Sequence, residues 1–391
     1  MTVFAGLGHM PGTDPAVAAD VIGGESGGVV HLPVLPARGL GAGPVARTGA
    51  MLADLPLDRG PRGWRVASSR ATGHAAHAGS IARDLLDADA DACEEAWGTA
   101  PAVVRLPVVG PLTLAAVVEL PTGHRMLTDP GAVRYLADAL GEGLRARIAD
   151  ARRRHGADVV VQVDEAVLDD VLRGRVPDAT GGATLPAVGR IEAAALLRAV
   201  FGPARDCGAA VTLRPAASPD AVSAPVIAEA APDALWVRVD RVRGTERLDS
   251  LGELVAAGIR PELGVVAATP GEAGAAGDGA GGVGGAGAAG RAGAARGVAG
   301  VAAGAAGGVA GPAGAQRDPV TGAWEVPDER IPAQEAARLW DELGFPRAEL
   351  AGDVTLTPRG GFERTPADWP AVALRCGRRA ADLVARAAGD L

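Results

Sequence analysis

The chain of 391 residues contains no lysine and no asparagine, so arginine supplies every permanent cationic side chain. The formal net charge is −9, and the arginines form no stripe interleaved with aromatic residues. Nucleic-acid binding needs clustered cations that neutralise phosphates, so we expect no nucleic-acid partner. Aromatic residues make up only 3% of the chain. A large core must therefore be built mainly from Val, Leu and Ala.

Cysteine is also scarce, with Cys93, Cys207 and Cys376 as the three examples. An odd number at wide spacings argues against a disulfide framework. The N-terminus has no basic segment followed by an apolar stretch, so no signal peptide is predicted. The most apolar run, residues 106–118, is short and broken by two prolines and a glycine, too short to span a bilayer. We expect a cytoplasmic protein without a membrane partner.

Short β-branched runs alternate along the chain with longer amphipathic runs. The runs predicted as strands are 2–7, 103–106, 158–163, 210–213, 234–237, 263–266 and 354–357. They are mostly apolar without polar alternation, which favours a parallel sheet buried on both faces. Asp129-Pro130 begins a predicted helix that ends before Gly156, and Thr365-Pro366 begins the last helix. Repeated strand–helix units indicate an α/β fold, although periodicity does not separate a closed barrel from an open sheet.

The segment 271–315 is almost entirely glycine and alanine. Glycine at this density opposes helix formation, so we interpret the segment as a flexible low-complexity insertion. We expect it to interrupt one domain, residues 1–391, without dividing the chain into two.

Active sites of parallel barrels lie at the C-terminal ends of the strands, and this rule selects the candidate residues. Asp164 and Glu165 end the strongest predicted strand, where carboxylates can bind an amine or move a proton. The alternative is that they are acids of a solvated loop. Gly8 lets the backbone approach a ligand closely, and His9 is a base, a ligand or a plain loop residue.

Three further motifs follow weaker patterns. Residues 110–113 (GPLT) have the composition of a turn, with Thr113 a candidate N-cap. His74 and His77 lie three residues apart, but no third metal ligand follows, so we expect a surface loop. The three cysteines lie away from C-terminal strand ends and carry no predicted role.

Several segments resemble the cobalamin-independent methionine synthase family, in its short actinobacterial form. They are residues 6–15 (GLGHMPGTDP), 31–39 (HLPVLPARG), 110–114 (GPLTL), 162–165 (QVDE), 343–345 (LGF) and 357–358 (TP). The QVDE segment looks like the family's Gln-hydrophobic-Asp-Glu-Pro motif, with Ala166 in place of proline. The likeness spans nearly the whole chain outside the glycine- and alanine-rich segment.

The resemblance implies a (β/α)8 TIM-type barrel, an architecture shared with uroporphyrinogen decarboxylase-like proteins. It also implies methyl transfer from a methylated folate or methylcobalamin to the thiol of homocysteine, which a zinc ion holds as thiolate. Asp164 would bind the amino group, and the backbone around Gly8 would face the carboxylate. Gly110, Pro111 and Thr113 would lie toward the folate.

The zinc ligands of the family do not carry over to this sequence. Residues 212–219 (TLRPAASP) contain no histidine or cysteine, and the last strand is followed by Arg359. Arg238 or Val239 stands where a carboxylate is expected, although Asp240 is close by. His9 replaces a serine, and Val34 stands where a glutamate is expected. A guanidinium has no lone pair to donate, so these changes replace a cation site with an anion site.

Three hypotheses stay open at this point. The first is a methyltransferase of this family. The second is a zinc-less divergent barrel enzyme in which Arg214 and Arg238 bind an anionic substrate while Asp164 and His9 perform acid–base chemistry; the arginine-rich decarboxylase barrels are an analogy at the level of fold alone. The third is a non-catalytic descendant that binds a ligand or a partner.

Overall fold

The computed structural model describes residues 2–52, 54–67, 75–275 and 315–391. Eight parallel strands form one sheet, and from β2 to β11 each strand pairs with the strand of this sheet that follows it along the chain. The strands are β1 (Val3–Phe4), β2 (Val29–His31), β5 (Val103–Val109), β7 (Asp158–Glu165), β8 (Ala210–Pro215), β9 (Ala234–Arg238), β10 (Arg260–Val266) and β11 (Thr355–Pro358). The sequence placed seven of these strands and missed β2; the predicted bounds are too long for β1, one residue early for β11 and too short for the other five.

Pairing between β1 and β11 brings the last strand back to the first. The remaining gap, between β1 and β2, is closed just beyond the ends of both strands. An isolated parallel bridge joins His9 to Val34. There the Val34 amide donates to the Gly8 carbonyl over 2.9 Å, and the Met10 amide donates to the Val34 carbonyl over 2.9 Å. The order of the strands and this closure confirm the predicted (β/α)8 barrel.

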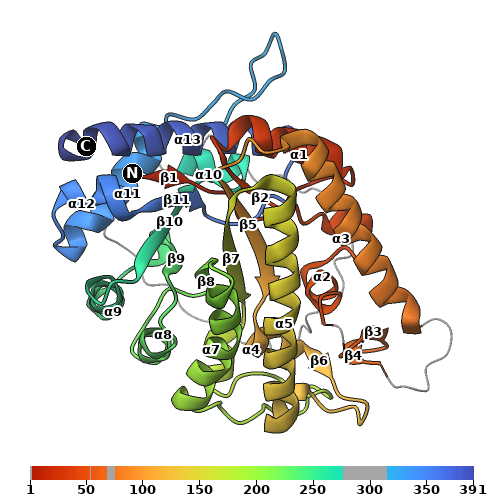
Figure 1. Cartoon of the computed structure of the whole chain (residues 1–391). Helices are drawn as coiled ribbons and strands as arrows, with labels where there is room; N and C mark the ends of the chain where they lie inside the picture. The colour runs from red at the N-terminus through yellow and green to blue at the C-terminus, as the bar shows by residue number, and fades with distance from the viewer. Residues whose placement is uncertain (1, 53, 68–74, 276–314) are drawn as a thin grey trace.

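Helices surround the sheet, with α5 and α7 along one side and α13 across one end (Figure 1). The helices are α1 (Pro15–Glu25), α2 (Pro44–Gly49), α3 (Ala75–Trp97), α4 (Pro111–Val117), α5 (Pro130–His155), α6 (Leu168–Leu172), α7 (Arg190–Asp206), α8 (Ala224–Ala230), α9 (Thr245–Ala256), α10 (Pro270–Ala275), α11 (Arg330–Leu343), α12 (Arg347–Asp353) and α13 (Trp369–Ala387). A small side sheet contains β3 (Leu57–Gly60), β4 (Gly63–Val66) and β6 (Val118–Glu119). No described helix is both long and apolar enough to cross a bilayer.

The signals that predicted α5 are those that form it. The Asp129 carboxylate accepts hydrogen bonds from the Gly131 and Ala132 amides, and Gly156 ends the helix with a φ of 64°. The start predicted for the last helix is wrong by a few residues. Helix α13 begins at Trp369, with Asp368 as N-cap. The Trp369 amide donates to the Pro366 carbonyl, so the proline belongs to a turn before the helix.

Two other predictions about local structure need correction. Residues 111–113 are the first turn of α4, and Gly110 is the N-cap, so this segment is a helix start and not a free turn. Proline at the first helical position and the apolar residues after it explain the helix. The insertion predicted over 271–315 begins too early, because residues 271–275 belong to α10. Residues 276–314 lie outside the described part of the chain.

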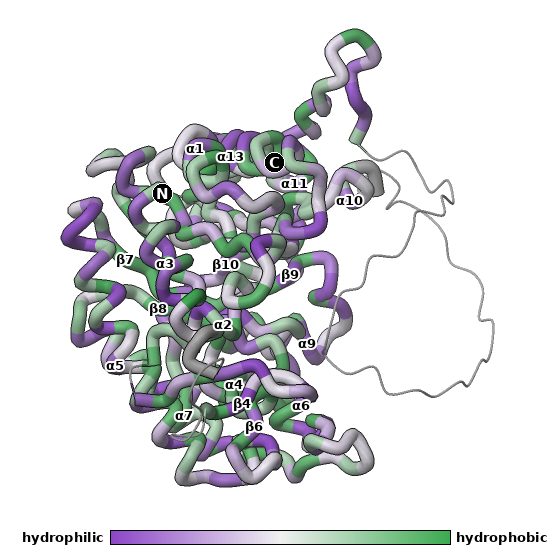
Figure 2. Tube along the Cα trace, turned by 90° about the vertical axis from the view of Figure 1, so that its right-hand side faces the viewer, coloured by the Kyte–Doolittle hydropathy of each residue, from purple (hydrophilic) through white to green (hydrophobic). Residues whose placement is uncertain are grey.

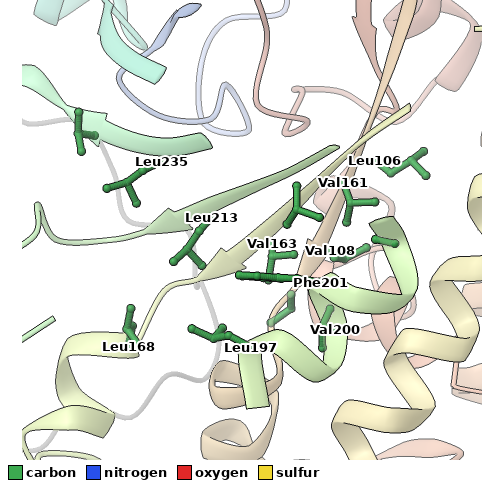
Figure 3. Close-up of a cluster of buried hydrophobic side chains, with 14 of the residues drawn as sticks. Leu106, Val108, Val161, Val163, Leu168, Leu197, Val200, Phe201, Leu213 and Leu235 are labelled. Atoms are coloured by element: carbon green, nitrogen blue, oxygen red, sulfur yellow. The ribbon is translucent and has the colours of Figure 1, made fainter. Parts of the chain in front are cut away.

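The hydrophobic core lies between the strands and the outer helices. Figure 3 shows Val163 of β7 and Val108 of β5 beside Phe201 of α7, and all three side chains are buried. In the tube of Figure 2, β7 and β8 contain hydrophobic residues interrupted by hydrophilic ones. Alternate residues of the same strands point the other way, into the barrel, and several of these are polar. The core of Val, Leu and Ala that the sequence predicted is therefore found on the outer face of the sheet. The inner face of the sheet also contains polar side chains.

Candidate functional site at the C-terminal mouth of the barrel

A buried ionic network fills the middle of the barrel. Arg105 of β5 donates to both carboxylate oxygens of Glu262 of β10, over 2.8 and 2.6 Å. Glu262 also accepts a hydrogen bond from the Thr212 hydroxyl, and Arg105 also donates to Oε1 of the Gln162 side chain. All four side chains are buried. The network joins β5, β7, β8 and β10 across the barrel and forms a polar floor beneath the mouth.

His31 of β2 lies in the same interior. Its ring is buried and neither nitrogen has a hydrogen-bond partner among the described residues. A Cβ atom added to Gly6 would overlap the His31 ring, so the glycine is what allows the ring its place. Burial lowers the pKa of His31 to about 3, and the positive charge of Arg105 and nearby His9 act in the same direction. His31 is therefore uncharged at neutral pH.

Above this floor, Asp164 and Arg214 form an ion pair between the ends of β7 and β8. One Arg214 guanidinium nitrogen lies 3.2 Å from Asp164 Oδ2. The Asp164 side chain is 12% exposed and the Arg214 side chain is 18% exposed. The strand register puts them directly side by side. Gln162 Nε2 donates to Asp164 Oδ1 over 2.9 Å and so fixes the carboxylate from below. Both side chains point to the mouth that the sequence predicted.

Arg214 is held by its surroundings without using its hydrogen-bond donors. Its guanidinium carbon lies 5.0 Å from the centre of the Trp236 ring. The Trp236 indole in turn donates to the Thr357 hydroxyl over 2.8 Å. The distance to Asp164 is that of an ion pair, and no hydrogen bond from the guanidinium is formed with any described residue. The Nε is closed off from solvent, so the donors available to a carboxylate or phosphate are those of the two terminal nitrogens.

His9 lies at the same mouth, in the bridge that closes the barrel. Burial lowers the pKa of His9, partly opposed by the negative charges of Asp164 and Glu363. Arg214 and Arg47 add to the lowering. The imidazole is consequently neutral at pH 7 and has a nitrogen that can accept a proton. Gly361 packs against it, because an added Cβ would lie 2.6 Å from the His9 Cβ.

Glu165 ends the same strand as Asp164 but points in the opposite direction. It is fully buried, and it accepts hydrogen bonds from the Leu112 amide (2.9 Å), the Thr113 amide (2.7 Å) and the Thr113 hydroxyl (2.6 Å). Burial raises the pKa of Glu165 to about 7, against the effect of these hydrogen bonds. The carboxyl group caps the N-terminus of α4. Glu165 was predicted to bind the substrate, but both oxygens of its carboxyl group already accept hydrogen bonds within the chain.

The residues predicted to face a folate are the ones that surround Glu165. Gly110, Pro111 and Thr113 are all buried. A Cβ added to Gly110 would overlap the Glu165 carboxyl group, so only glycine allows this close approach. Thr113 is not the N-cap that its position suggested, since Gly110 occupies that place. These residues hold Glu165 and α4, and their role toward a folate stays a prediction.

Gly8 also has a structural reason for its identity. Its φ is 100°, in the region that favours glycine, and an added Cβ would lie 2.8 Å from Pro107 Cγ. Its carbonyl accepts the Val34 amide in the closing bridge. Gly8 therefore shapes the turn that presents His9 at the mouth, and its contact with a substrate carboxylate stays a prediction.

Arg238, at the end of β9, differs from Arg214. It donates to Asp240 over 2.8 Å and to Glu272 of α10 over 3.1 Å. Glu272 in turn accepts from the Ala268 amide over 2.9 Å. The donors of Arg238 thus hold the loop after β9 to the start of α10. Of the two arginines predicted to bind an anion, Arg214 has free donors and Arg238 serves a structural contact.

Zinc, which the resemblance implies, does not fit the side chains at the mouth. Arg214 and Arg238 lie at the C-terminal ends of β8 and β9, Arg359 follows β11, and each guanidinium is paired with a carboxylate. Protonated guanidinium has no lone pair for a metal. Across residues 2–52, 54–67, 75–275 and 315–391, no group of three or more His, Cys, Asp or Glu side chains could hold a metal ion.

The cysteines lie apart from this mouth. Burial raises the pKa of Cys93 in α3, and it raises the pKa of Cys376 in α13 to about 12. Neither thiol is therefore a ready nucleophile. His77 belongs to α3 and not to a loop, and His74 lies outside the described residues.

Comparison with known proteins adds little to the geometry of the fold and the site. No family model matches the chain, and no curated protein is similar to it in sequence. Among solved structures, it is similar to a B12-independent methionine synthase from Shewanella sp. W3-18-1 in complex with selenomethionine. The two share 10% identity with a TM-score of 0.44, over 87% of this chain and 77% of the other. A likeness at this level carries no conclusion, so the fold rests on the strand order and the site on its own geometry.

Sequence reasoning missed two residues that shape the mouth. Trp236 packs against Arg214, and Glu363 reaches His9 from the loop after β11. Gln162, which positions Asp164, was part of the QVDE segment found in the sequence, although no role was predicted for it. Trp236 and Glu363 gave no signal, because their relation to the site depends on neighbours far away in the sequence.

Proposed function

We propose that the mouth of the barrel binds a small substrate that carries both an amino group and an acidic group, as an amino acid does. The observation that carries the proposal is the Asp164–Arg214 pair, in which a positioned carboxylate lies beside a guanidinium with free donors. An ammonium group would bind Asp164, and a carboxylate would bind Arg214 with two parallel hydrogen bonds. On binding, the ammonium group of the substrate would take the place of Arg214 beside Asp164. The carboxylate of the substrate would take the place of Asp164 beside Arg214, and both new contacts would be hydrogen-bonded.

We further propose that the protein is an enzyme and that His9 accepts a proton from this substrate. A neutral imidazole beside the bound head group fulfils the first requirement for a general base. The negative charges of Asp164 and Glu363 would stabilise the imidazolium that forms. The reaction class that fits is acid–base chemistry on an amino acid without a bound metal. This is the zinc-less form of the divergent barrel enzyme that the sequence left open.

Methyl transfer to a thiol stays the second candidate, supported by the sequence resemblance and by one structural feature. A thiol must become a thiolate before it attacks a methyl group. His9 could accept that proton, and the amino acid head group of homocysteine would match Asp164 and Arg214. The arginines at the strand ends do not support a zinc-bound thiolate, so this candidate depends on His9 alone.

Calorimetric binding of three ligands tests the head-group site. L-homocysteine should bind, whereas an analogue without the amino group and one without the carboxylate should bind at least about tenfold more weakly. Arg214→Gln and Asp164→Asn should each weaken L-homocysteine by about tenfold or more. Arg238→Gln is the matched control, because its donors are already used, and it should leave affinity unchanged. Equal affinity for all three ligands would contradict the proposal.

The pH dependence of turnover tests His9. Activity should persist as the pH drops below 6.5 and fall only at more acidic pH, since the folded-state pKa of His9 lies below that ordinary value and only neutral imidazole accepts a proton. His9→Gln should remove the activity with little change in binding. Methyl transfer from methyltetrahydrofolate to L-homocysteine, measured with and without added zinc, separates the two candidates. Zinc-dependent turnover would contradict the metal-free reaction.

A further inference from the structure

A second hollow lies beside the mouth, between the loops that follow β7, β8 and β9. Its volume is about 500 Å³. Asp169 and Asp170 form one wall, Ser218 lies in another, and Arg241, Arg243 and Arg247 form the third. Ala166 and Ala216, which also line it, follow Asp164 and Arg214 by two residues. The hollow is therefore next to the head-group site yet lined by different side chains.

The basic wall of this hollow has charge that no described carboxylate neutralises. None of Arg241, Arg243 and Arg247 forms an ion pair within residues 2–52, 54–67, 75–275 and 315–391. Arg243 Nε donates to the Asp240 carbonyl over 3.1 Å, and Arg247 donates to the Arg241 carbonyl over 3.3 Å. These backbone contacts orient two of the guanidinium groups and leave their other donors available.

The acidic wall is only partly neutralised. Asp169 pairs with Arg173 and Arg175, and Asp170 pairs with Arg175. Arg173 also pairs with Asp220, so two arginines serve three aspartates. Glu246, in the first turn of α9, accepts a hydrogen bond from the Ala221 amide over 3.3 Å. The positive charge of the hollow is therefore confined to the side formed by Arg241, Arg243 and Arg247.

A buried hydroxyl lies in the same hollow without a partner. Ser218 is 5% exposed, and its Oγ forms no hydrogen bond within the described part of the chain. A buried hydroxyl without a partner is unfavourable, and native structures usually satisfy such groups. The Oγ is closed off from solvent in the unliganded chain, so an oxygen of a bound anion would become its partner once the serine side chain turns toward the hollow. This observation is independent of the charge of the arginines.

We propose that this hollow is a subsite for a phosphate group, bound by Arg241, Arg243, Arg247 and Ser218. A phosphate dianion carries the charge and the number of acceptor oxygens that three guanidinium groups and one hydroxyl can meet. The start of α9, between Arg243 and Arg247, adds amides at the positive end of a helix. The subsite goes beyond the head-group site and does not depend on it.

Phosphate titration of the full chain at low ionic strength tests the subsite. Inorganic phosphate should bind and sodium chloride at the same ionic strength should not imitate it. The double variant Arg243→Gln/Arg247→Gln should weaken phosphate binding by about tenfold or more. Arg83→Gln is the matched control, because Arg83 is exposed on α3 and forms no ion pair with any described residue. Unchanged binding by the double variant, or equal weakening by Arg83→Gln, would overturn the proposal.

The Ser218 hydroxyl gives a second readout. Ser218→Ala should weaken phosphate binding by about threefold while leaving unfolding without phosphate unchanged or slightly more difficult. A loss of stability without phosphate, together with unchanged phosphate affinity, would show a structural hydroxyl and count against the subsite. Comparison of inorganic phosphate with glycerol 3-phosphate shows whether the source is free phosphate or an organic ester. Failure of L-homocysteine to bind leaves these outcomes unaffected, so the two proposals fail separately.

Discussion

The interior of the barrel and its mouth each contain an ion pair between strands, and the two pairs are built differently. Arg105 and Glu262 are buried, bidentate and supported by Thr212 and Gln162. Asp164 and Arg214 are partly exposed, and their contact is an ion pair without a hydrogen bond. The interior pair uses both terminal nitrogens of Arg105 and leaves only its buried Nε without a partner, whereas the terminal nitrogens of Arg214 in the mouth pair form no hydrogen bond with a described residue. Satisfied polar groups indicate structure, and unsatisfied ones at a strand end indicate a binding site.

The contrast extends to the histidines. His31 in the interior is packed against Gly6 and has no partner, while His9 at the mouth faces two carboxylates. Burial keeps both rings neutral, but only His9 is next to the side chains that would hold a substrate. The interior histidine therefore affects stability, and the mouth histidine affects chemistry.

The largest effect should come from breaking the interior pair on one side. Arg105→Met leaves Glu262 buried without its cation and should lower the free energy of unfolding by about 3–5 kcal/mol. The double variant Arg105→Met/Glu262→Met should recover most of this loss, because an apolar pair of similar volume needs no compensation. Urea denaturation measures both. A single-variant loss below about 1 kcal/mol would show that the interior pair resembles the mouth pair.

An intermediate effect should come from acid. The folded-state pKa of His31, about 3, lies below its ordinary value of 6.5. Below pH 6.5 the unfolded chain therefore binds a proton that the folded chain does not, and stability falls as pH falls toward 3. Between pH 7 and pH 5 this amounts to about 2 kcal/mol.

The His31→Gln variant should lose that part of the pH dependence. His124 is exposed, so the control variant His124→Gln should show the same pH dependence as the wild-type chain. Denaturation curves at pH 7 and pH 5 for the three proteins give the comparison. A wild-type chain whose pH dependence equals that of His31→Gln would place the ring in contact with water.

The smallest effect on stability should come from the mouth. Asp164→Asn keeps an oxygen that accepts from Gln162 and should change the free energy of unfolding by less than about 1 kcal/mol, as for other partly exposed pairs. The same substitution should weaken ligand binding strongly. A stability loss as large as that of Arg105→Met would make the mouth pair a second structural contact and remove the reason to regard it as a site.

Much of the architecture was predictable from the sequence, because strands and helices depend on neighbours along the chain. The hydrophobic runs placed the strands from β5 to β11, and Asp129 and Gly156 bounded α5. Strand β2 and the closing bridge were not found, since three residues of strand give too short a pattern. The position of Asp164 at a strand end followed from the same local signals.

The tertiary structure decided what the individual side chains do. Asp164 and Glu165 are adjacent in sequence, but successive strand residues point to opposite faces, so one meets Arg214 and the other caps α4. Arg105 and Glu262 are 157 residues apart and meet across the barrel. The sequence alone determined the order of elements and the polar strand end. Closure of the sheet, which sets the neighbours of every inward-facing side chain, decided which of those polar groups were satisfied and which were left for a ligand.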